Sequence, residues 1–220
     1  MIMNVAIDGP AGAGKSTIAK RVAKELEFIY VDTGAMYRAM ALYLLKQGIA
    51  AEDKEGIETA CQNADITIAY IDGEQQVILN GENVTPYIRT EEVGNMASAS
   101  SVNGKVREKL VALQQKLASE KSVVMDGRDI GTTVLPNAQL KIYLTASSAC
   151  RAKRRFDELT AKGQTCDLAK IEEDIIERDY RDMNREISPL KQADDAVYVD
   201  SSEMGIEEVV NTILDLYRKL

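Results

Sequence analysis

The sequence Gly9-Pro-Ala-Gly-Ala-Gly-Lys-Ser-Thr17 follows a short apolar run at residues 5–7, and a helical pattern begins at its last residue. Two glycines separated by four residues, with Lys-Ser directly after the second, form the pattern of a phosphate-binding loop between a strand and a helix. In such a loop the backbone N–H groups point at phosphate oxygens, and the N-terminus of the helix adds partial positive charge. The pattern predicts that the chain binds a nucleoside triphosphate.

Three side chains are expected to serve the triphosphate and its metal ion. Lys15 should reach the outer phosphates and act in catalysis, and the Ser16 hydroxyl should bind Mg²⁺. Asp126 closes a second apolar run, residues 123–125, and resembles the carboxylate that holds the hydration shell of Mg²⁺ in such proteins. The alternatives are an ordinary glycine-rich turn and a helix-capping aspartate. The residues expected to bind ATP are Gly9, Pro10, Ala11, Gly12, Ala13, Gly14, Lys15, Ser16 and Thr17.

The chain is acidic, with a formal net charge of −8 over 220 residues. An acidic surface argues against general binding of nucleic acid or of anionic membranes. No apolar run approaches the length that crosses a bilayer, and no signal peptide precedes the first strand. We expect a cytoplasmic protein, acting as a monomer, whose partners are small molecules rather than nucleic acid or membrane.

Histidine is absent, and the three cysteines, Cys61, Cys150 and Cys166, lie far apart without metal-ligand spacing. They are interpreted as reduced thiols. Without histidine the chain has no imidazole base, nucleophile or metal ligand. An enzyme of this composition depends on carboxylates, lysine, arginine and a metal ion carried by the nucleotide.

Apolar runs alternate with segments of helical periodicity and predict an α/β protein. The runs cover residues 5–7, 28–31, 123–125, 140–144 and 196–199. The helical segments cover residues 17–26, 35–47, 88–101, 102–118, 151–159, 171–187 and 206–216. This order predicts a P-loop three-layer fold around a five-stranded parallel sheet, with ligands at the carboxyl ends of the strands.

One segment breaks the alternation. Residues 66–71 and 76–79 flank Asp72-Gly73, and Asn80-Gly81 follows at once. These dipeptides are strong hairpin signals. We therefore expect a small antiparallel hairpin sheet inserted into the parallel fold.

Arginines gather after the predicted strands and on two predicted helices. Arg128 and Asp129 follow Asp126, and Tyr37-Arg38 lies one turn into the second helix. One set, with i, i+3, i+4 spacing, is Arg151, Arg154 and Arg155. The other, with i, i+3 or i+4, i+7 spacing, is Arg178, Arg181 or Asp182, and Arg185. Each set is expected on one face of its helix. One interpretation is a salt-bridged surface, with Arg178 paired to Asp182. The other is phosphate binding, which guanidinium groups in an acidic protein favour.

The absence of histidine indicates which kind of group could accept the phosphoryl group of the triphosphate. A phosphate monoester is already close to a dianion near pH 7, since its second pKa is about 6, and it needs no base before it attacks. Catalysis then consists of aligning two charged groups and neutralising their charge. A hydroxyl acceptor would instead require a base such as Asp32 or Asp129.

Several segments together resemble the bacterial cytidylate kinases over nearly the whole chain. They are residues 7–17, Asp32-Thr-Gly-Ala-Met-Tyr-Arg38, residues 88–93 and 106–108, Asp126-Gly-Arg-Asp-Ile-Gly-Thr132, and Glu177-Arg-Asp-Tyr-Arg-Asp-Met-Asn-Arg185. The resemblance implies an enzyme that uses ATP to phosphorylate CMP and dCMP to CDP and dCDP. The alternative is another small P-loop kinase with a different monophosphate acceptor. A regulatory GTPase is disfavoured because no Asn-Lys-x-Asp motif follows a later strand.

The resemblance also implies how the chain is divided. Residues 1–220 form a single kinase unit with a core of 1–32, 119–149 and 167–220. A monophosphate-binding domain, 33–118, carries the β insert at about 65–90, and a short helical lid covers about 150–166.

Carried over residue by residue, the resemblance implies a substrate site. The residues expected at the CMP phosphate are Thr33, Tyr37, Arg38, Arg128 and Arg185. Ser98, Arg107 and Asp129 are expected to contact cytosine, and Arg178 and Asp182 the sugar. The lid arginines would stabilise charge on the migrating phosphoryl group. The catalytic residues chosen are Lys15, Arg128, Arg185 and, from the lid, Arg154.

Overall fold

The computed structural model describes residues 2–220 and divides into two units. Unit 1 combines the described residues up to Tyr30 with Lys121–Leu220, and unit 2 is Val31–Glu120. The predicted monophosphate-binding domain, 33–118, falls within unit 2, and the predicted lid, about 150–166, falls within unit 1. Unit 2 is thus an insertion in the chain that forms unit 1.

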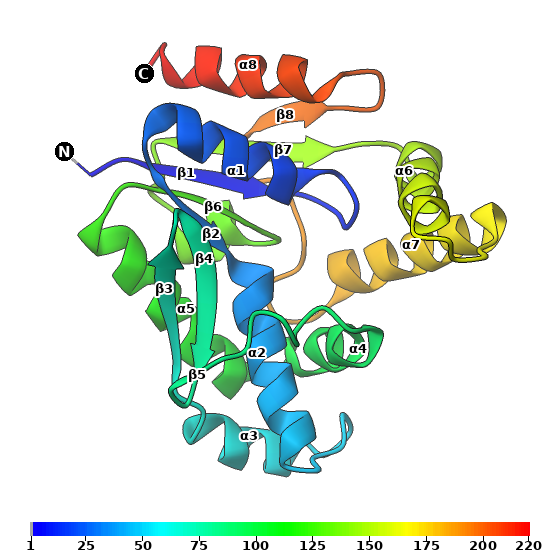
Figure 1. Ribbon diagram of the computed structural model, residues 1–220. Coiled ribbons are helices and arrows are strands. Elements are labelled where there is room, and N and C mark those ends of the chain that lie inside the picture. The colour runs from blue at the N-terminus through cyan, green and yellow to red at the C-terminus, as the bar shows by residue number, and fades with distance from the viewer. Residues whose placement is uncertain (1) are drawn as a thin grey trace. The chain divides into compact units, whose positions relative to one another are not determined.

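A five-stranded parallel sheet confirms the predicted fold class (Figure 1). Its strands, in spatial order, are β2 (Ile29–Asp32), β6 (Val123–Gly127), β1 (Asn4–Asp8), β7 (Leu140–Thr145) and β8 (Val197–Asp200). The apolar residues of β1 are fully buried, which explains why that strand is a continuous apolar run rather than an alternating one. Because β1 is the middle strand, the phosphate-binding loop emerges at the centre of the sheet edge.

Two helices of unit 1 cover one face of this sheet. Helices α1 (Lys15–Leu26) and α8 (Ile206–Tyr217) pack on each other and on the sheet (Figure 1). Val22 of α1 and Ile213 of α8 lie in one apolar cluster with Val5 and Ile142 of the strands. Apolar residues at helical spacing on α1 therefore form the buried stripe that holds the loop's helix in place.

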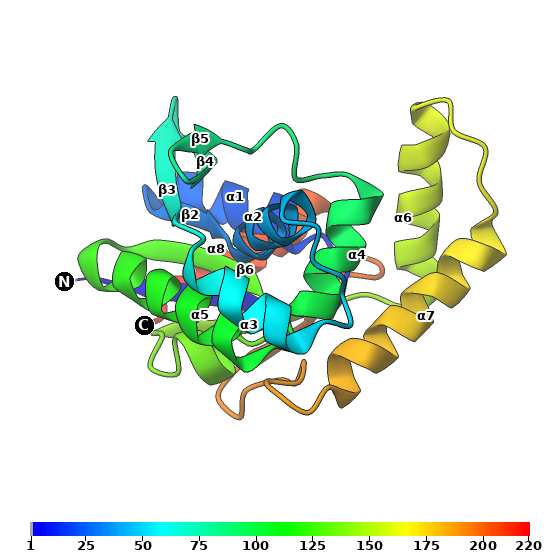
Figure 2. The same ribbon diagram turned by 90° about the horizontal axis from the view of Figure 1, so that it is seen from below.

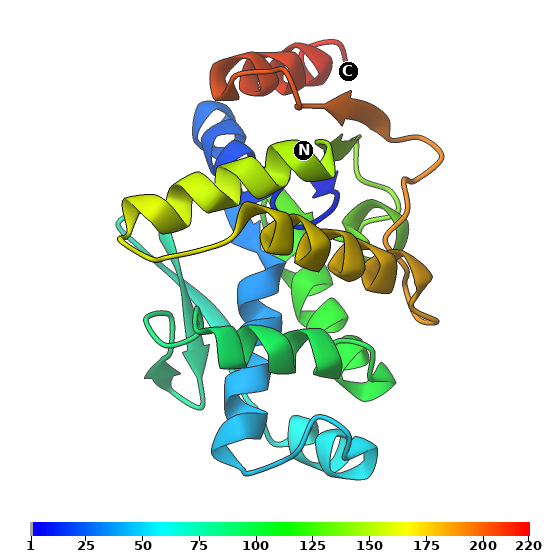
Figure 3. The same cartoon turned by 90° about the vertical axis from the view of Figure 1, so that its right-hand side faces the viewer.

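A helix pair extends from the other side of unit 1. Helices α6 (Ser148–Ala161) and α7 (Leu168–Asn184) lie side by side and are joined by a short connection (Figure 3). The side chain of Ser147 caps α6 and that of Asp167 caps α7. None of the helices within residues 2–220 has the length and apolar character needed to cross a bilayer.

In unit 2, helix α2 (Thr33–Lys46) runs through the middle (Figure 2). It packs against α3 (Lys54–Gln62), α4 (Glu91–Ser100), α5 (Gly104–Glu120) and the sheet formed by β3 (Ile66–Ile71), β4 (Glu74–Leu79) and β5 (Glu82–Asn83). Both hairpin turns have positive φ at their two central residues, 53° and 78° for Asp72-Gly73 and 50° and 84° for Asn80-Gly81. This is the backbone that such dipeptides favour, and it confirms the predicted inserted hairpin.

Helix ends depart from the sequence prediction where local side chains compete. Helix α4 begins at Glu91 rather than at residue 88, because the Thr90 hydroxyl accepts from Val93 N and caps the helix there. Helix α3 escaped the sequence analysis, since it buries only Ile57 and Cys61. A single π-helical turn, η1 (Ile130–Val134), follows β6 and was also not predicted.

The end of α7 corrects a more important expectation. The helix ends at Asn184, so Arg185 lies outside it with an extended backbone rather than on the face that carries Arg178. Ser188 has φ 50° and the next residue is Pro189, which cannot continue a helix. The predicted helix over residues 171–187 was therefore wrong at its end.

Gly9 is the position where the backbone tolerates no side chain. Its φ is 149°, and a Cβ there would lie 1.9 Å from the carbonyl oxygen of Leu144 at the end of β7. We expect Gly9→Ala to lower the free energy of unfolding by on the order of 3 kcal/mol or more. Gly48→Ala is the control, because Gly48 has φ 69° but open space around it, and should cost only about 1 kcal/mol. Equal losses in urea titrations would contradict this account of the loop.

Candidate active site

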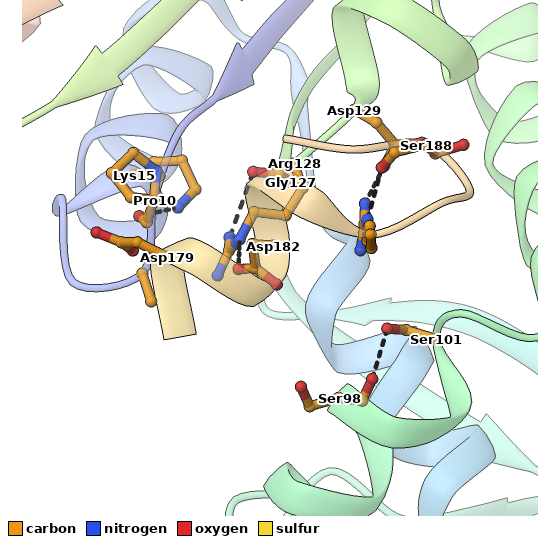
Figure 4. A network of polar contacts seen from close by, with 12 residues as sticks. Pro10, Lys15, Ser98, Ser101, Gly127, Arg128, Asp129, Asp179, Asp182 and Ser188 are labelled. Atoms are coloured by element: carbon orange, nitrogen blue, oxygen red, sulfur yellow. Dashed lines mark hydrogen bonds and ion pairs between the residues drawn. The ribbon is translucent and has the colours of Figure 1, made fainter. Parts of the chain in front are cut away.

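The phosphate-binding loop holds its lysine over its own backbone. Gly12 and Gly14 have φ of 76° and 85°, and Lys15 is buried, with Nζ donating to the Pro10 carbonyl at 2.7 Å (Figure 4). Burial and the nearby charge of Arg128 lower the pKa of Lys15 to about 7, against the opposing effect of neighbouring carboxylates. An anion that enters the loop meets the Lys15 amine already positioned inside it and able to take up a proton.

The two residues predicted to bind Mg²⁺ lie in contact. Ser16 Oγ donates to Asp126 Oδ2 at 3.0 Å, and the Tyr30 hydroxyl donates to Asp126 Oδ1 at 2.9 Å. Asp126 does not cap a helix, since the next element, η1, begins at Ile130. A hydroxyl and a buried carboxylate are oxygen ligands of the kind that Mg²⁺ prefers, so the residues present fit this ion.

A group of arginines surrounds one carboxylate near the end of β6. Arg128 Nε donates to Asp182 Oδ2 at 2.9 Å (Figure 4). Burial alone would raise the pKa of Asp182, but the charges of Arg128, Arg178 and Arg185 and the Arg128 hydrogen bond lower it overall. Asp182 and, beside Arg185, Asp129 are two carboxylates next to these three guanidinium groups, so the group keeps an excess of positive charge that suits an anion. Asp182, which was considered as a partner of Arg178, accepts this hydrogen bond from Arg128.

The turn that follows α7 sets the direction of the Arg185 side chain. Its Nε donates to the Ser188 carbonyl at 2.6 Å, and its Nη2 lies 3.7 Å from Asp129 Oδ1. The side chains of Arg185 and Asp129 are both buried, 9% and 8% exposed. The structure therefore brings Arg185 to Asp129 through the turn, not through helical periodicity.

The three lid arginines do not share one environment, contrary to expectation. Arg151 is buried and makes a two-point ion pair with Asp179 at 3.1 and 2.5 Å. Arg154 donates to the Ser201 carbonyl at 2.7 Å, and Arg155 pairs with a neighbouring glutamate on the exposed side of α6. The environments differ because the arginines lie at different places on α6, which packs on α7. Arg151 lies in the first turn of α6, and Arg155 lies one turn further along the helix.

Arg151 also joins the lid to the phosphate-binding loop. Its Nη1 donates to the Ala11 carbonyl at 2.9 Å, and its Nε donates to the Ala146 carbonyl at 2.9 Å. The loop, the end of β7 and helix α7 thus meet at one guanidinium group. The sequence analysis named Arg151 among three arginines that could meet the reacting phosphate, and in this structure its guanidinium donors bind groups of the protein.

Asp8 is a functional candidate that sequence reasoning missed. It ends β1 directly before the loop, is buried, and accepts from the backbone N–H groups of Ile130 and Gly131, both at 2.7 Å. Burial raises the pKa of Asp8 to about 6, although those hydrogen bonds oppose the shift. Asp8 therefore fixes η1, the turn that follows Arg128 and Asp129. The sequence feature that could have identified Asp8 is an acidic residue between an apolar strand and the phosphate-binding loop.

Unit 2 carries the remaining predicted residues. Thr33, Tyr37 and Arg38 lie on α2, Ser98 on α4 and Arg107 on α5. The Arg107 guanidinium lies 5.9 Å from the centre of the Tyr37 ring, a cation–π contact that joins a residue expected at the phosphate to one expected at the base. The Ser98 carbonyl accepts from Ser101 Oγ at 2.9 Å (Figure 4).

Comparison with known sequences identifies the family of the chain. The sequence profile described as cytidylate kinase matches residues 5–219. A protein named cytidylate kinase from Caldicellulosiruptor bescii is 52% identical over 99% of this chain and 96% of its own. The chain belongs to the cytidylate kinase family. A cytidylate kinase from Listeria monocytogenes is 53% identical over 96% of this chain and 94% of its own.

Structural comparison adds only the fold. A solved structure of an uncharacterized protein from Eubacterium ventriosum has a TM-score of 0.53 and 12% identity, covering 99% of each chain. The parallel sheet and its loop give the chain a P-loop fold, and its family makes it a nucleoside-monophosphate kinase. ATP is the phosphoryl donor of that family.

The lowered pKa of Lys15 makes ATP binding depend on protons. At pH 8 a group of pKa about 7 is about nine-tenths neutral, and an arriving triphosphate raises its pKa and recharges it. We expect calorimetry at pH 8 in buffers of different ionisation enthalpy to show that the protein takes up about 0.9 proton for each ATP bound. Lys15→Met should abolish the uptake, and Asp8→Asn should retain it. Uptake that persists in Lys15→Met would assign the proton to another group.

The ion pair between Arg151 and Asp179 should contribute strongly to stability. Arg151→Met leaves a buried carboxylate without its partner and should lower the free energy of unfolding by about 3–5 kcal/mol. Adding Asp179→Leu should recover much of the loss. Arg155→Met is the control, since its exposed pair should contribute at most about 1 kcal/mol. Equal effects at the two arginines in urea unfolding would refute the anchoring role of Arg151.

Proposed function

We propose that this cytidylate kinase transfers the γ-phosphoryl group of ATP directly to the phosphate of CMP or dCMP, giving CDP or dCDP. The observation that carries the proposal is the group of Arg128, Arg178 and Arg185, whose charges together act on the carboxylate of Asp182. This excess of positive charge belongs to the same unit as the phosphate-binding loop, so the charges needed by a donor and by an acceptor phosphate are both available.

The donor half uses the loop. Residues 9–17 bind the phosphates of ATP through backbone N–H groups, and Lys15 neutralises charge on the group being transferred. Ser16 and Asp126 would hold Mg²⁺, which supplies further charge neutralisation when bound. Asp8 keeps the turn after Asp129 in register with the loop.

The acceptor half is assigned residue by residue. For the CMP phosphate we assign Arg128 and Arg185 and, from unit 2, Thr33, Tyr37 and Arg38. For the base we assign Ser98, Arg107 and Asp129, because cytosine presents an amino donor beside a ring acceptor, and a carboxylate with a nearby donor matches that pair. Arg178 and Asp182 are assigned to the sugar.

The chemistry needs no general base. The acceptor is a phosphate that is largely dianionic near pH 7, so the protein has only to align it and to neutralise charge. Lys15, Arg128, Arg185 and Arg154 are the residues proposed for this task, with Arg154 moving from its contact with Ser201. We further propose that the enzyme acts as a monomer in the cytoplasm.

A substrate panel tests the function. With ATP and Mg²⁺, ADP release should be fast with CMP and dCMP and slower by about 10²-fold or more with UMP, AMP, dTMP and shikimate. Asp129→Asn should reduce the preference for CMP over UMP while leaving the KM for ATP within about twofold. Equal turnover across the panel, or turnover of the alcohol alone, would overturn the proposal. An unchanged preference in Asp129→Asn would move base recognition to another residue.

A further inference from the structure

A glutamine of the inserted sheet reaches the start of α2. Strand β2 is an edge strand of the parallel sheet, so the backbone of its last residue, Asp32, has one side without a neighbouring strand. Gln75 of β4 fills that side: its Oε1 accepts from Asp32 N at 2.8 Å, and its Nε2 donates to Asp32 O at 3.2 Å. One side-chain amide thus makes both bonds that a neighbouring strand would make with this residue.

The side chain of Asp32 is also fully engaged. Its Oδ1 accepts from Ala35 N at 2.9 Å and caps α2, and its Oδ2 accepts from Arg89 Nη2 at 2.9 Å. Asp32 is buried, whereas the side chain of Arg89 is 63% exposed. The turn that starts α2 is therefore held by four hydrogen bonds of Asp32, of which two come from Gln75 and one from Arg89, both within residues 65–90.

The residues assigned to the acceptor phosphate lie directly at this turn. Thr33 is the first residue of α2 and follows Asp32. A Cβ placed on Gly34 would lie 3.2 Å from Asp32 Oδ1 and 3.4 Å from Arg38 Nη1, so the Arg38 guanidinium folds back over the start of the helix. A hydroxyl, a guanidinium and the N-terminus of a helix converge where Gln75 fixes the backbone.

We propose that Gln75 is a positioning residue for phosphoryl transfer: by binding both backbone groups of Asp32, it sets Thr33 and Arg38 at the geometry that the acceptor phosphate needs. The inserted sheet is then part of the acceptor site through this one side chain. The inference rests on the proposed function, because it takes the phosphate of CMP as the ligand of Thr33 and Arg38. It predicts a defect confined to the phosphate of the acceptor.

The chain offers a matched control on the same strand. Gln76 is the next residue, is half-buried like Gln75, and accepts from Asn83 Nδ2 at 3.0 Å within the insert. Gln76→Ala removes a glutamine and a hydrogen bond from the same sheet without touching Asp32. Gln75→Met removes both hydrogen bonds of the side-chain amide but keeps the length of the side chain. Comparison with Gln75→Ala therefore separates the loss of these hydrogen bonds from the loss of side-chain volume.

The experiment measures steady-state kinetics of these variants and calorimetric binding of CMP and of cytidine, which lacks the phosphate. Gln75→Ala and Gln75→Met should raise the KM and Kd for CMP by about tenfold or more, with the KM for ATP and the Kd for cytidine within about twofold of the wild type. Gln76→Ala should resemble the wild type in all four quantities. Thermal melts of each variant accompany the measurements.

Several outcomes would overturn the inference. Unchanged CMP binding in both Gln75 variants would exclude it, as would an equal loss for cytidine. Unfolding of both Gln75 variants while Gln76→Ala remains folded would make Gln75 a brace of the domain and nothing more. Failure of the wild-type enzyme to phosphorylate CMP would instead refute the proposed function. This result comes from the wild type alone and does not depend on the variants.

Discussion

Cations that must meet phosphates are kept in place by buried carboxylates and carbonyls at the carboxyl ends of the parallel strands. Arg128 is held by Asp182, Arg185 approaches Asp129, and Lys15 rests on the Pro10 carbonyl. Without these acceptors, like charges would repel one another and the long side chains would lose their order. The arginines and the lysine are thus concentrated in one place within a chain whose formal net charge is −8.

The sheet makes this crowding possible because β1, β6 and β7 are neighbours whose ends open at one edge. Gly9 lets the chain leave β1 directly over Leu144, and Asp8 binds the backbone of η1 after β6. Asp8 therefore ties the start of the loop to the turn that follows Arg128. Pre-positioned donors of this kind need little reorganisation during reaction, which is the main electrostatic contribution of an enzyme to phosphoryl transfer.

Much of this could be predicted from the sequence because local patterns decide it. Apolar runs marked every strand of the parallel sheet, and the two Gly-containing dipeptides marked the inserted hairpins. What escaped prediction depends on distant partners. The role of Arg151 follows from Asp179 on another helix, and the position of Arg185 follows from a turn that periodicity does not encode. Asp8 resembled an ordinary strand end until its partners in η1 were known.

The anchoring of α6 at its first turn also bears on how such proteins can change over evolution. Arg151 ties that turn to Ala11 and to α7, whereas the connection between α6 and α7, residues 162–167, lies at the far end of the pair. Changes of length in this connection leave the contacts of Arg151 intact, and exposed connections tolerate insertions at little thermodynamic cost. A change of length there would alter the far end of the α6–α7 pair and leave the phosphate-binding loop with its shape.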